Sequence, residues 1–199
     1  MKQWQIPTAL GLSALLVVVL LILDLMRAPR TVELAKPRDL PDIPLYDETG
    51  NTLALNAASG GWRLLFPGFT YCPDICPTTL SRLALVADDL APVRVILFSV
   101  DPERDAPQRL REYVEYFHPS FGAWVPASIS HLNTAAPALG IAYRKVQLQH
   151  DYTVDHSTAM PLIAPDGRII ALFPEFFEPE ALLLEVRRIV EAHGTAGLP

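Results

Sequence analysis

The sequence predicts a single domain of the α/β class. Short apolar runs with the composition of buried strands alternate with stretches of helical periodicity, and a hairpin and an amphipathic helix follow them. Half of the 199 residues are hydrophobic and 19% are charged, which is typical of a folded chain rather than a disordered one. When the apolar N-terminus and the polar linker after it are set aside, roughly 150 residues remain, which is the usual size of one domain.

The N-terminus, residues 1–27, is predicted to be a membrane anchor. Residues 6–23 carry no charge over 18 residues, close to the length that a helix needs to span the hydrocarbon core of a bilayer. Asp24 follows directly, without the small residues of a cleavage site, so we expect an anchor that is retained and contacts membrane lipid. Residues 28–44 hold four prolines and several charges without periodicity, which predicts an extended linker.

The domain is predicted to cover residues 45–199 and to open with a β-hairpin. Two short extended stretches flank a turn at residues 49–51. The apolar run 62–66 predicts a buried strand. Residues 93–100 are rich in β-branched side chains and predict a central strand that is buried on both faces, as in a parallel sheet.

The first helix is predicted to begin at Pro77, because proline is well placed at the first position of a helix. Apolar residues at helical spacing continue it to about Leu90. The other predicted elements are two helices and two strands toward the C-terminus, at residues 106–117, 159–164, 168–173 and 178–192.

The only two cysteines lie together as Cys72-Pro-Asp-Ile-Cys76, at the predicted junction between a buried strand and a helix N-terminus. The unpaired amides and the dipole of a helix N-terminus favour an anion, so these thiols are expected to ionise more readily than a free cysteine. Thiolate is both a nucleophile and a metal ligand. The pair could therefore serve as a structural disulfide, as a redox-active dithiol or as part of a metal site.

A structural disulfide is the least favoured role, because a pair four residues apart closes a loop too small to constrain the unfolded chain much. A redox-active dithiol is an alternative by analogy with Cys-x-x-Cys enzymes, whose spacing is one residue shorter. A metal site is favoured over both. Two soft thiolates and an imidazole, without an obvious fourth ligand, select copper, whereas a structural zinc site normally takes four protein ligands.

The imidazole must come from one of five histidines. His156 is favoured because it lies just before the apolar stretch that leads into the strand predicted at 159–164. His150, in the preceding polar loop, is the reserve candidate, and Met160 is expected to pack despite its soft sulfur. The remaining histidines are expected to be surface residues: His118, His131 and His193.

These motifs resemble the Sco/SenC family of copper-binding, thioredoxin-like assembly factors for cytochrome c oxidase. Four stretches carry the resemblance: residues 68–77 (GFTYCPDICP), 98–105 (FSVDPERD), 154–157 (VDHS) and 162–167 (LIAPDG). It implies a thioredoxin-like fold and one copper ion bound by Cys72, Cys76 and His156. Asp74 and Asp101 would belong to the surrounding loops, and Asp101 is equally well explained as a turn residue that ends its strand.

The resemblance implies a metallochaperone that receives copper and delivers it to the binuclear copper centre of cytochrome c oxidase subunit II. The expected partners are this subunit or the protein that donates the copper. The alternative is a membrane-anchored thiol-disulfide oxidoreductase that reduces cysteines of a partner without carrying copper. Nucleic acid is not an expected partner, because 16 basic against 22 acidic residues give a net charge of −6 without a basic cluster.

The expected location is a bacterial inner membrane, crossed once, with the C-terminal domain in the periplasm. No Arg-rich, Ser-rich presequence precedes the anchor, which favours a bacterial membrane over an organelle. Basic residues after the anchor outnumber those before it, and this bias alone would place the domain in the cytoplasm. The cysteine chemistry and the resemblance favour the periplasm. One departure from the family pattern is Pro161, which removes a backbone donor and predicts an irregular start to its strand.

Overall fold

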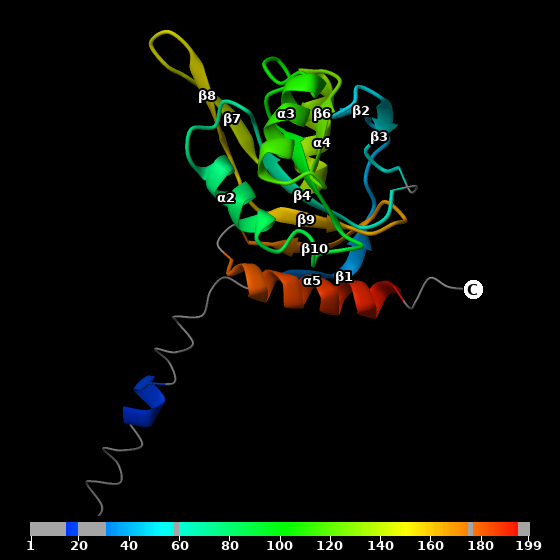
Figure 1. Ribbon diagram of the computed structural model, residues 1–199, viewed down its shortest axis with the longest axis vertical. Helices are drawn as coiled ribbons and strands as arrows, with labels where there is room; N and C mark the ends of the chain where they lie inside the picture. The colour runs from blue at the N-terminus through cyan, green and yellow to red at the C-terminus, as the bar shows by residue number, and fades with distance from the viewer. Residues whose placement is uncertain (1–14, 20–30, 58–59, 175–176, 195–199) are drawn as a thin grey trace, which may run out of the picture. The chain divides into compact units, whose positions relative to one another are not determined.

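A mixed sheet of eight strands organises the chain, which the computed structural model describes at residues 15–19, 31–57, 60–174 and 177–194 (Figure 1). The strand order is β1-β10-β9-β4-β5-β6-β2-β3. Its strands are β1 (Val32–Arg38), β2 (Pro44–Asp47), β3 (Thr52–Ala54), β4 (Arg63–Gly68), β5 (Arg94–Ser99), β6 (Gly122–Pro126), β9 (Met160–Ile163) and β10 (Ile169–Phe173). The numbered helices are α2 (Ile75–Ala84), α3 (Pro107–Phe117), α4 (Ile129–Leu139) and α5 (Pro179–Gly194). A separate hairpin pairs β7 (Tyr143–Gln147) with β8 (Tyr152–His156).

The centre of the sheet is the parallel pair β4 and β5. Every residue of β4 is buried, and the pair runs in register from Arg63 beside Arg94 to Gly68 beside Ser99. Parallel neighbours need a crossover connection, and α2 lies in the segment that makes it. The antiparallel pair β9–β10 and helix α5 follow later in the chain. This βαβ unit followed by a ββα unit confirms the predicted α/β, thioredoxin-like fold.

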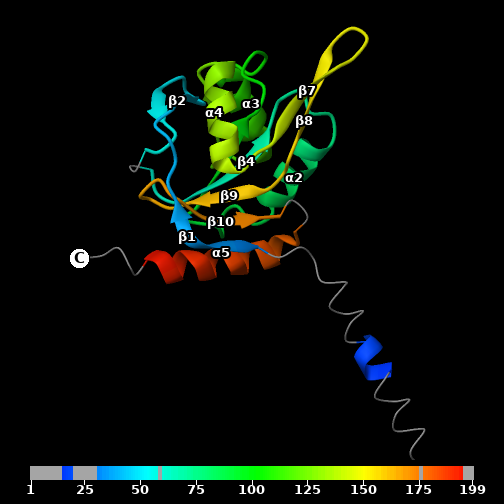
Figure 2. The same ribbon diagram turned by 180° about the vertical axis from the view of Figure 1, so that it is seen from behind.

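Helices cover both faces of the sheet. The two opposite views show α2, α3 and α5 on one face and α4 on the other (Figures 1 and 2). Each helix turns an apolar side toward the core, for example Leu80 and Leu83 in α2 and Val186 and Ile189 in α5. Because the sheet is buried on both faces, its central strands are almost wholly apolar, as the sequence predicted for residues 93–100.

Most predicted elements are found within a few residues of their expected ends. The opening hairpin is β2–β3, the strands at 62–66, 159–164 and 168–173 are β4, β9 and β10, and the two later helices are α3 and α5. Helix α2 is displaced from its prediction, since it begins at Ile75 rather than Pro77 and ends at Ala84 rather than near Leu90. Proline is tolerated throughout the first turn of a helix, so Pro77 did not mark the first residue.

The segment 28–44 was predicted to be an extended linker, and this is wrong for residues 32–38. They form β1, which pairs with β10 in the antiparallel sense, and Leu34 packs against the core. The chain also divides into units after Arg30, so that β1 belongs with the α/β unit. The physical reason is that the outer edge of β10 offers unpaired backbone groups that an extended segment can satisfy.

The irregularity expected at Pro161 is found only on one side of β9. The pairing of β9 with β4 includes Leu162 and Ile163 but not Pro161. On the other side Pro161 pairs regularly with Leu172 of β10, and the register shift lies further along, between Ile169 and Ala171. The Met160–Pro161 peptide bond is trans; among the described residues, Ala91–Pro92 is the cis bond. Besides β1, four elements were not predicted: β6, α4, β7 and β8.

The predicted anchor at 6–23 lies outside the described residues except for 15–19, which are helical. None of the helices in the described part of the chain has the length and apolar composition needed to cross a membrane.

Candidate metal centre

The two cysteines lie at the junction between β4 and α2. The chain turns after Gly68, where the Cys72 amide donates to the Phe69 carbonyl oxygen at 3.2 Å. Cys76 lies in the first turn of α2, and its amide donates to the Cys72 sulfur at 3.3 Å. The free N–H groups of the helix N-terminus are thus directed at a sulfur, which favours the thiolate form of Cys72.

Glycine occupies position 68, at the end of β4, where there is little room for a side chain. A Cβ atom there would lie 3.2 Å from the Cys76 sulfur and 3.1 Å from side-chain atoms of Leu97 and Phe66. These contacts are tighter than ordinary van der Waals packing, so a side chain would displace the sulfur or the strand. The sequence motif Gly-Phe-Thr therefore has a packing role beside the cysteines.

His156, the last residue of β8, reaches the cysteines from the other side. Its Nε2 lies 3.9 Å from the Cys76 sulfur, and its Nδ1 lies 3.0 Å from the Ser157 carbonyl oxygen. A carbonyl oxygen can only accept, so Nδ1 donates to it, and Nε2 is the ring nitrogen that faces the sulfur. The Phe69 ring meets the imidazole edge to face at 5.9 Å and limits its rotation.

The structure brings together the three residues that the sequence singled out. The sulfurs of Cys72 and Cys76 and a ring nitrogen of His156 all lie within 4.8 Å of one another. Cys72 is 9% exposed, Cys76 is fully buried, and His156 is half-buried. Cys72 and His156 line a cleft of about 420 Å³ together with Asp74 and Thr153, so the cluster opens to solvent on the side of these two residues.

The two thiols differ strongly in acidity. The pKa of Cys72 is lowered to about 4, chiefly by a hydrogen bond with the Cys76 side chain; the His156 side chain and the amides of Cys76 and Asp74 add to this, and burial opposes it. The same contact and burial raise the pKa of Cys76 well above that of a free thiol. One thiolate and one thiol therefore share the site at neutral pH, with the proton on the deeper sulfur.

Asp105 supports the loop that precedes Cys72. It lies in the motif at residues 98–105, but no role was predicted for it from the sequence. It is 2% exposed and accepts hydrogen bonds from the Thr70 hydroxyl at 2.6 Å and the Ser99 hydroxyl at 2.7 Å. Burial raises its pKa, and these donors oppose the rise. Asp105 thus ties the end of β5 to the segment that immediately precedes Cys72.

Asp101 is more than the turn residue that ends β5. It is buried, accepts a hydrogen bond from the Tyr152 hydroxyl at 2.8 Å and forms an ion pair with Arg104. Asp74, by contrast, lines the cleft at the N-cap position of α2, and its side chain makes no capping hydrogen bond. Because Tyr152 lies in β8, Asp101 links the β5 loop to the strand that carries His156.

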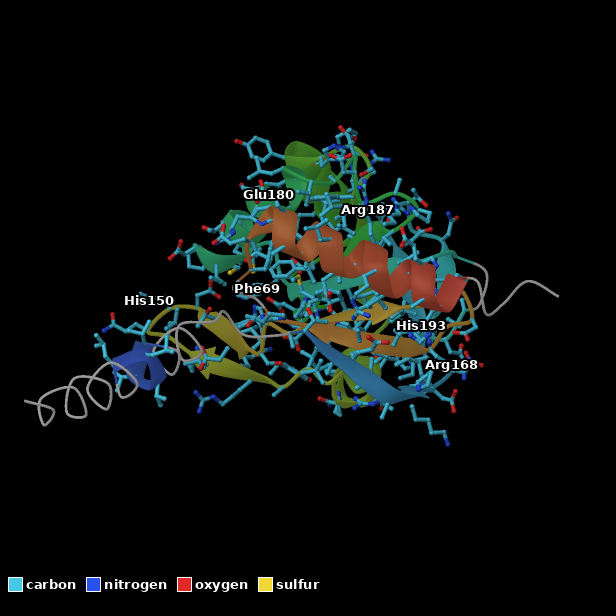
Figure 3. All side chains as sticks on the ribbon, turned by 90° about the horizontal axis from the view of Figure 1, so that it is seen from below. Phe69, His150, Arg168, Glu180, Arg187 and His193 are labelled. Carbon is cyan, nitrogen blue, oxygen red and sulfur yellow. The ribbon has the colours of Figure 1, made fainter. Side chains whose placement is uncertain are left out.

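The other histidines lie apart from the cysteines. His150 is exposed at the outer end of the β7–β8 hairpin, well away from Phe69, and His193 lies on α5 (Figure 3). His118 bonds Ser120, and His131 bonds the N-cap Ser128. Met160 is fully buried in the core, so the expected packing role is confirmed.

Comparison with known proteins points to one family. A family model described as SCO1/SenC matches residues 38–191. A protein of Stutzerimonas stutzeri that is named for copper binding is 34% identical over 142 residues, which are 68% of this chain and 69% of that protein. The mitochondrial SCO1 homolog 1 of Arabidopsis thaliana is 33% identical over 144 residues, 69% of this chain but 43% of the plant protein.

Solved structures agree with the sequence relatives. The crystal structure of Arabidopsis thaliana ScoI with copper bound matches with a TM-score of 0.69 at 30% identity. The match covers 79% of this chain and 98% of that one. Sequence and structure therefore point to the same family.

Proposed function

The chain belongs to the SCO1/SenC family, and we propose that it binds one copper ion through Cys72, Cys76 and His156 and passes that ion on during cytochrome c oxidase assembly. The observation that carries the proposal is the cluster of two sulfurs and one imidazole nitrogen within 4.8 Å. Relatives whose names or titles state copper binding support the choice of metal.

The donor set suits copper on chemical grounds. Two thiolates are soft ligands that select copper over harder divalent ions, and neutral imidazole is a good third ligand. Cys72 is already ionised at neutral pH and needs no proton loss, and His156 turns Nε2 toward the Cys76 sulfur. Cys76 would release its proton as the ion binds, which makes copper uptake pH-dependent.

Copper would be the ion that this site transfers, and a site with three protein ligands suits transfer to a partner. A site with three protein ligands keeps a coordination position open, and here the open side faces the cleft beside His156. Cysteines of a partner could enter there and take over the ion one ligand at a time. We propose that the partner is cytochrome c oxidase subunit II, or the protein that loads this chain with copper.

The oxidation state of the cysteines would control the transfer. Oxidation of the Cys72 thiolate and the Cys76 thiol to a disulfide would pass two electrons to an oxidant such as a partner disulfide, release one proton and remove two of the three ligands. Only the reduced chain would then hold copper.

Residues 6–23 are proposed to anchor the chain in a bacterial inner membrane with the α/β domain in the periplasm.

A second function, thiol-disulfide exchange, is favoured by the unequal acidity of the two cysteines. The Cys72 thiolate would attack a partner disulfide, break its S–S bond and form a mixed disulfide. Cys76 would then displace the partner, which leaves with two reduced cysteines while Cys72 and Cys76 become a disulfide. Two electrons pass to the partner, and His156 is not needed as a ligand.

Copper binding by the full chain, purified in reduced form, tests the two functions. The measurements are the copper stoichiometry and the thiolate-to-copper charge-transfer absorption for the wild type, Cys72→Ser, Cys76→Ser and His156→Ala. His150→Ala is the matched control, because this histidine lies on the same hairpin but away from the cysteines.

We expect one equivalent of Cu(II) and a charge-transfer band in the wild type and in His150→Ala, with the band lost or altered in the other three variants. A reduced wild type that takes up no copper but readily cycles its disulfide would contradict the copper function and support thiol exchange.

The location is tested with reporters fused to the C-terminus. Such reporters should be active only in the periplasm, and activity only in the cytoplasm would overturn that assignment.

A further inference from the structure

The hairpin β7–β8 holds His156, yet in the described part of the chain it pairs with none of the eight strands of the main sheet. It projects from the body of the domain in both ribbon views (Figures 1 and 2). An isolated two-stranded hairpin is marginally stable in water. The position of His156 relative to the cysteines therefore depends on the side-chain contacts that fasten the hairpin to the domain.

Arg104 supplies the densest set of these contacts. Its guanidinium donates to the Tyr152 carbonyl oxygen at 3.0 Å and pairs with Asp151 at 3.2 Å, and both partners belong to the hairpin. It also lies over the Tyr152 ring at 3.7 Å. Asp101, which forms an ion pair with Arg104, accepts the Tyr152 hydroxyl and closes the cluster.

The same guanidinium reaches the cysteine loop. It lies over the ring of Tyr71, the residue before Cys72, at 4.7 Å, and 6.0 Å from the centre of the Phe69 ring, which packs on His156. The Arg104 side chain is 15% exposed, so these interactions are only partly screened by water. One side chain thus contacts both segments whose separation determines the Cys-Cys-His geometry.

We propose that Arg104 is a positioning residue that holds the β7–β8 hairpin against the cysteine loop and thereby sets the distance from His156 to the two sulfurs. The copper-binding part of this inference rests on the proposed function. Arginine suits the role because its planar fork can bond a carboxylate, a carbonyl and a ring face together, which a lysine ammonium does not reproduce.

Amide hydrogen exchange of the copper-free full chain tests the positioning directly. Arg104→Met keeps the length of the side chain but removes the charge and the donors, and Arg104→Lys keeps the charge. Arg109→Met is the matched control, because Arg109 also contacts Tyr71, through its hydroxyl at 2.7 Å, and is an exposed residue of α3. Exchange is compared between residues 143–156 and the central strand β4.

We expect exchange in residues 143–156 to quicken about tenfold or more in Arg104→Met, less in Arg104→Lys and not in Arg109→Met, with β4 unchanged. If Arg104→Met does not fold, Tyr152→Phe removes the single hydroxyl that bonds Asp101 and should quicken the same exchange. Equal exchange in the Arg104 and Arg109 variants would overturn the proposal.

Copper loss to a chelator supplies the second readout. Arg104→Met should lose copper about tenfold faster than the wild type and should shift its charge-transfer spectrum toward that of His156→Ala. The double variant should lose copper no faster than His156→Ala alone, because Arg104 acts through the histidine. If the double variant loses copper faster than His156→Ala by the same factor that Arg104→Met shows alone, Arg104 does not act through the histidine and this part of the proposal is wrong. A wild type without copper would defeat the proposed function, and hydrogen exchange would still decide whether Arg104 holds the hairpin.

Discussion

The acidity of Cys72 can be tested through the pH dependence of its alkylation. The perturbation is a change of pH from 5 to 8 in the reduced protein without copper. With a pKa of about 4, Cys72 is already more than about 90% ionised at pH 5, whereas a free thiol of pKa about 8.5 is below about 0.1% ionised there. Only the thiolate reacts with iodoacetamide, so ionisation controls the rate.

The absolute rate at one pH is a poor measure of this difference. At pH 6 the thiolate fraction favours Cys72 over a free thiol by roughly 300-fold, but the intrinsic nucleophilicity of a thiolate falls with its pKa by roughly 100-fold over the same interval. The two effects nearly cancel. The change of the alkylation rate with pH is free of this problem. The intrinsic nucleophilicity of a thiolate is independent of pH, so this change reports only the ionised fraction of Cys72.

The assay is therefore the alkylation rate of Cys72 at four pH values, with peptide mapping by mass spectrometry to separate it from Cys76. The expected rate changes by less than about twofold between pH 5 and 8, whereas a free thiol would accelerate several hundredfold. Cys76→Ala removes the largest cause of the lowered pKa and should give a steeper profile. A several hundredfold rise at wild-type Cys72 would refute the thiolate assignment.

Three further predictions concern stability. Leu80→Ala opens a cavity beneath α2, where Leu80 is fully buried, and should lower the free energy of unfolding by about 2 to 5 kcal/mol in urea denaturation, against about 0.5 kcal/mol or less for the exposed Leu85→Ala. Gly167 has a positive φ of 85°, and a Cβ atom there would lie 2.4 Å from the Asn56 carbonyl oxygen. Gly167→Ala should therefore lower the melting temperature more than Gly50→Ala, because Gly50 has a similar φ but open space around it. Equal losses in the two variants would show that the clash with Asn56 contributes nothing. Hydrogen bonding to Arg188, and then to His193, lowers the pKa of Glu33 in the folded chain. The ionised carboxylate therefore stabilises the fold at any pH above the pKa of Glu33 in the unfolded chain. This contribution disappears as the pH falls through the pKa of Glu33 in the folded chain. Glu33→Gln should therefore cost less than about 1 kcal/mol at pH 7 and progressively less below about pH 4, and a larger cost in acid would contradict this sign.

The central fold was accessible from sequence because its determinants are local. Residues 93–100 have a composition that only a doubly buried strand satisfies, and helices α3 and α5 show a continuous apolar face. The start of α2 was placed two residues late, because proline is accepted at several positions of the first turn. This error mattered for the site, since it placed Cys76 at the end of a loop, whereas the structure has it in the first turn of the helix.

Strand β1 shows where local reasoning failed. Its proline and charges are typical of a linker, and nothing in residues 32–38 alone indicates pairing. The strand exists because β10, more than a hundred residues later, leaves an edge to which it can add. The hairpin β7–β8 is similar, since its residues are exposed or half-buried except for Val154, and its position depends on contacts with the β5 loop.

By itself, the sequence determined the α/β class, the order of the central elements and the three residues with the chemistry of a soft-metal site, because each depends on residue type and short-range spacing. The tertiary structure alone decided how those residues meet. Cys76 and His156 are 80 positions apart, and their contact at 3.9 Å depends on the hairpin, Asp101 and Arg104 together. The division of one thiolate and one thiol between Cys72 and Cys76 likewise follows from burial and hydrogen-bond direction, which are properties of the folded chain.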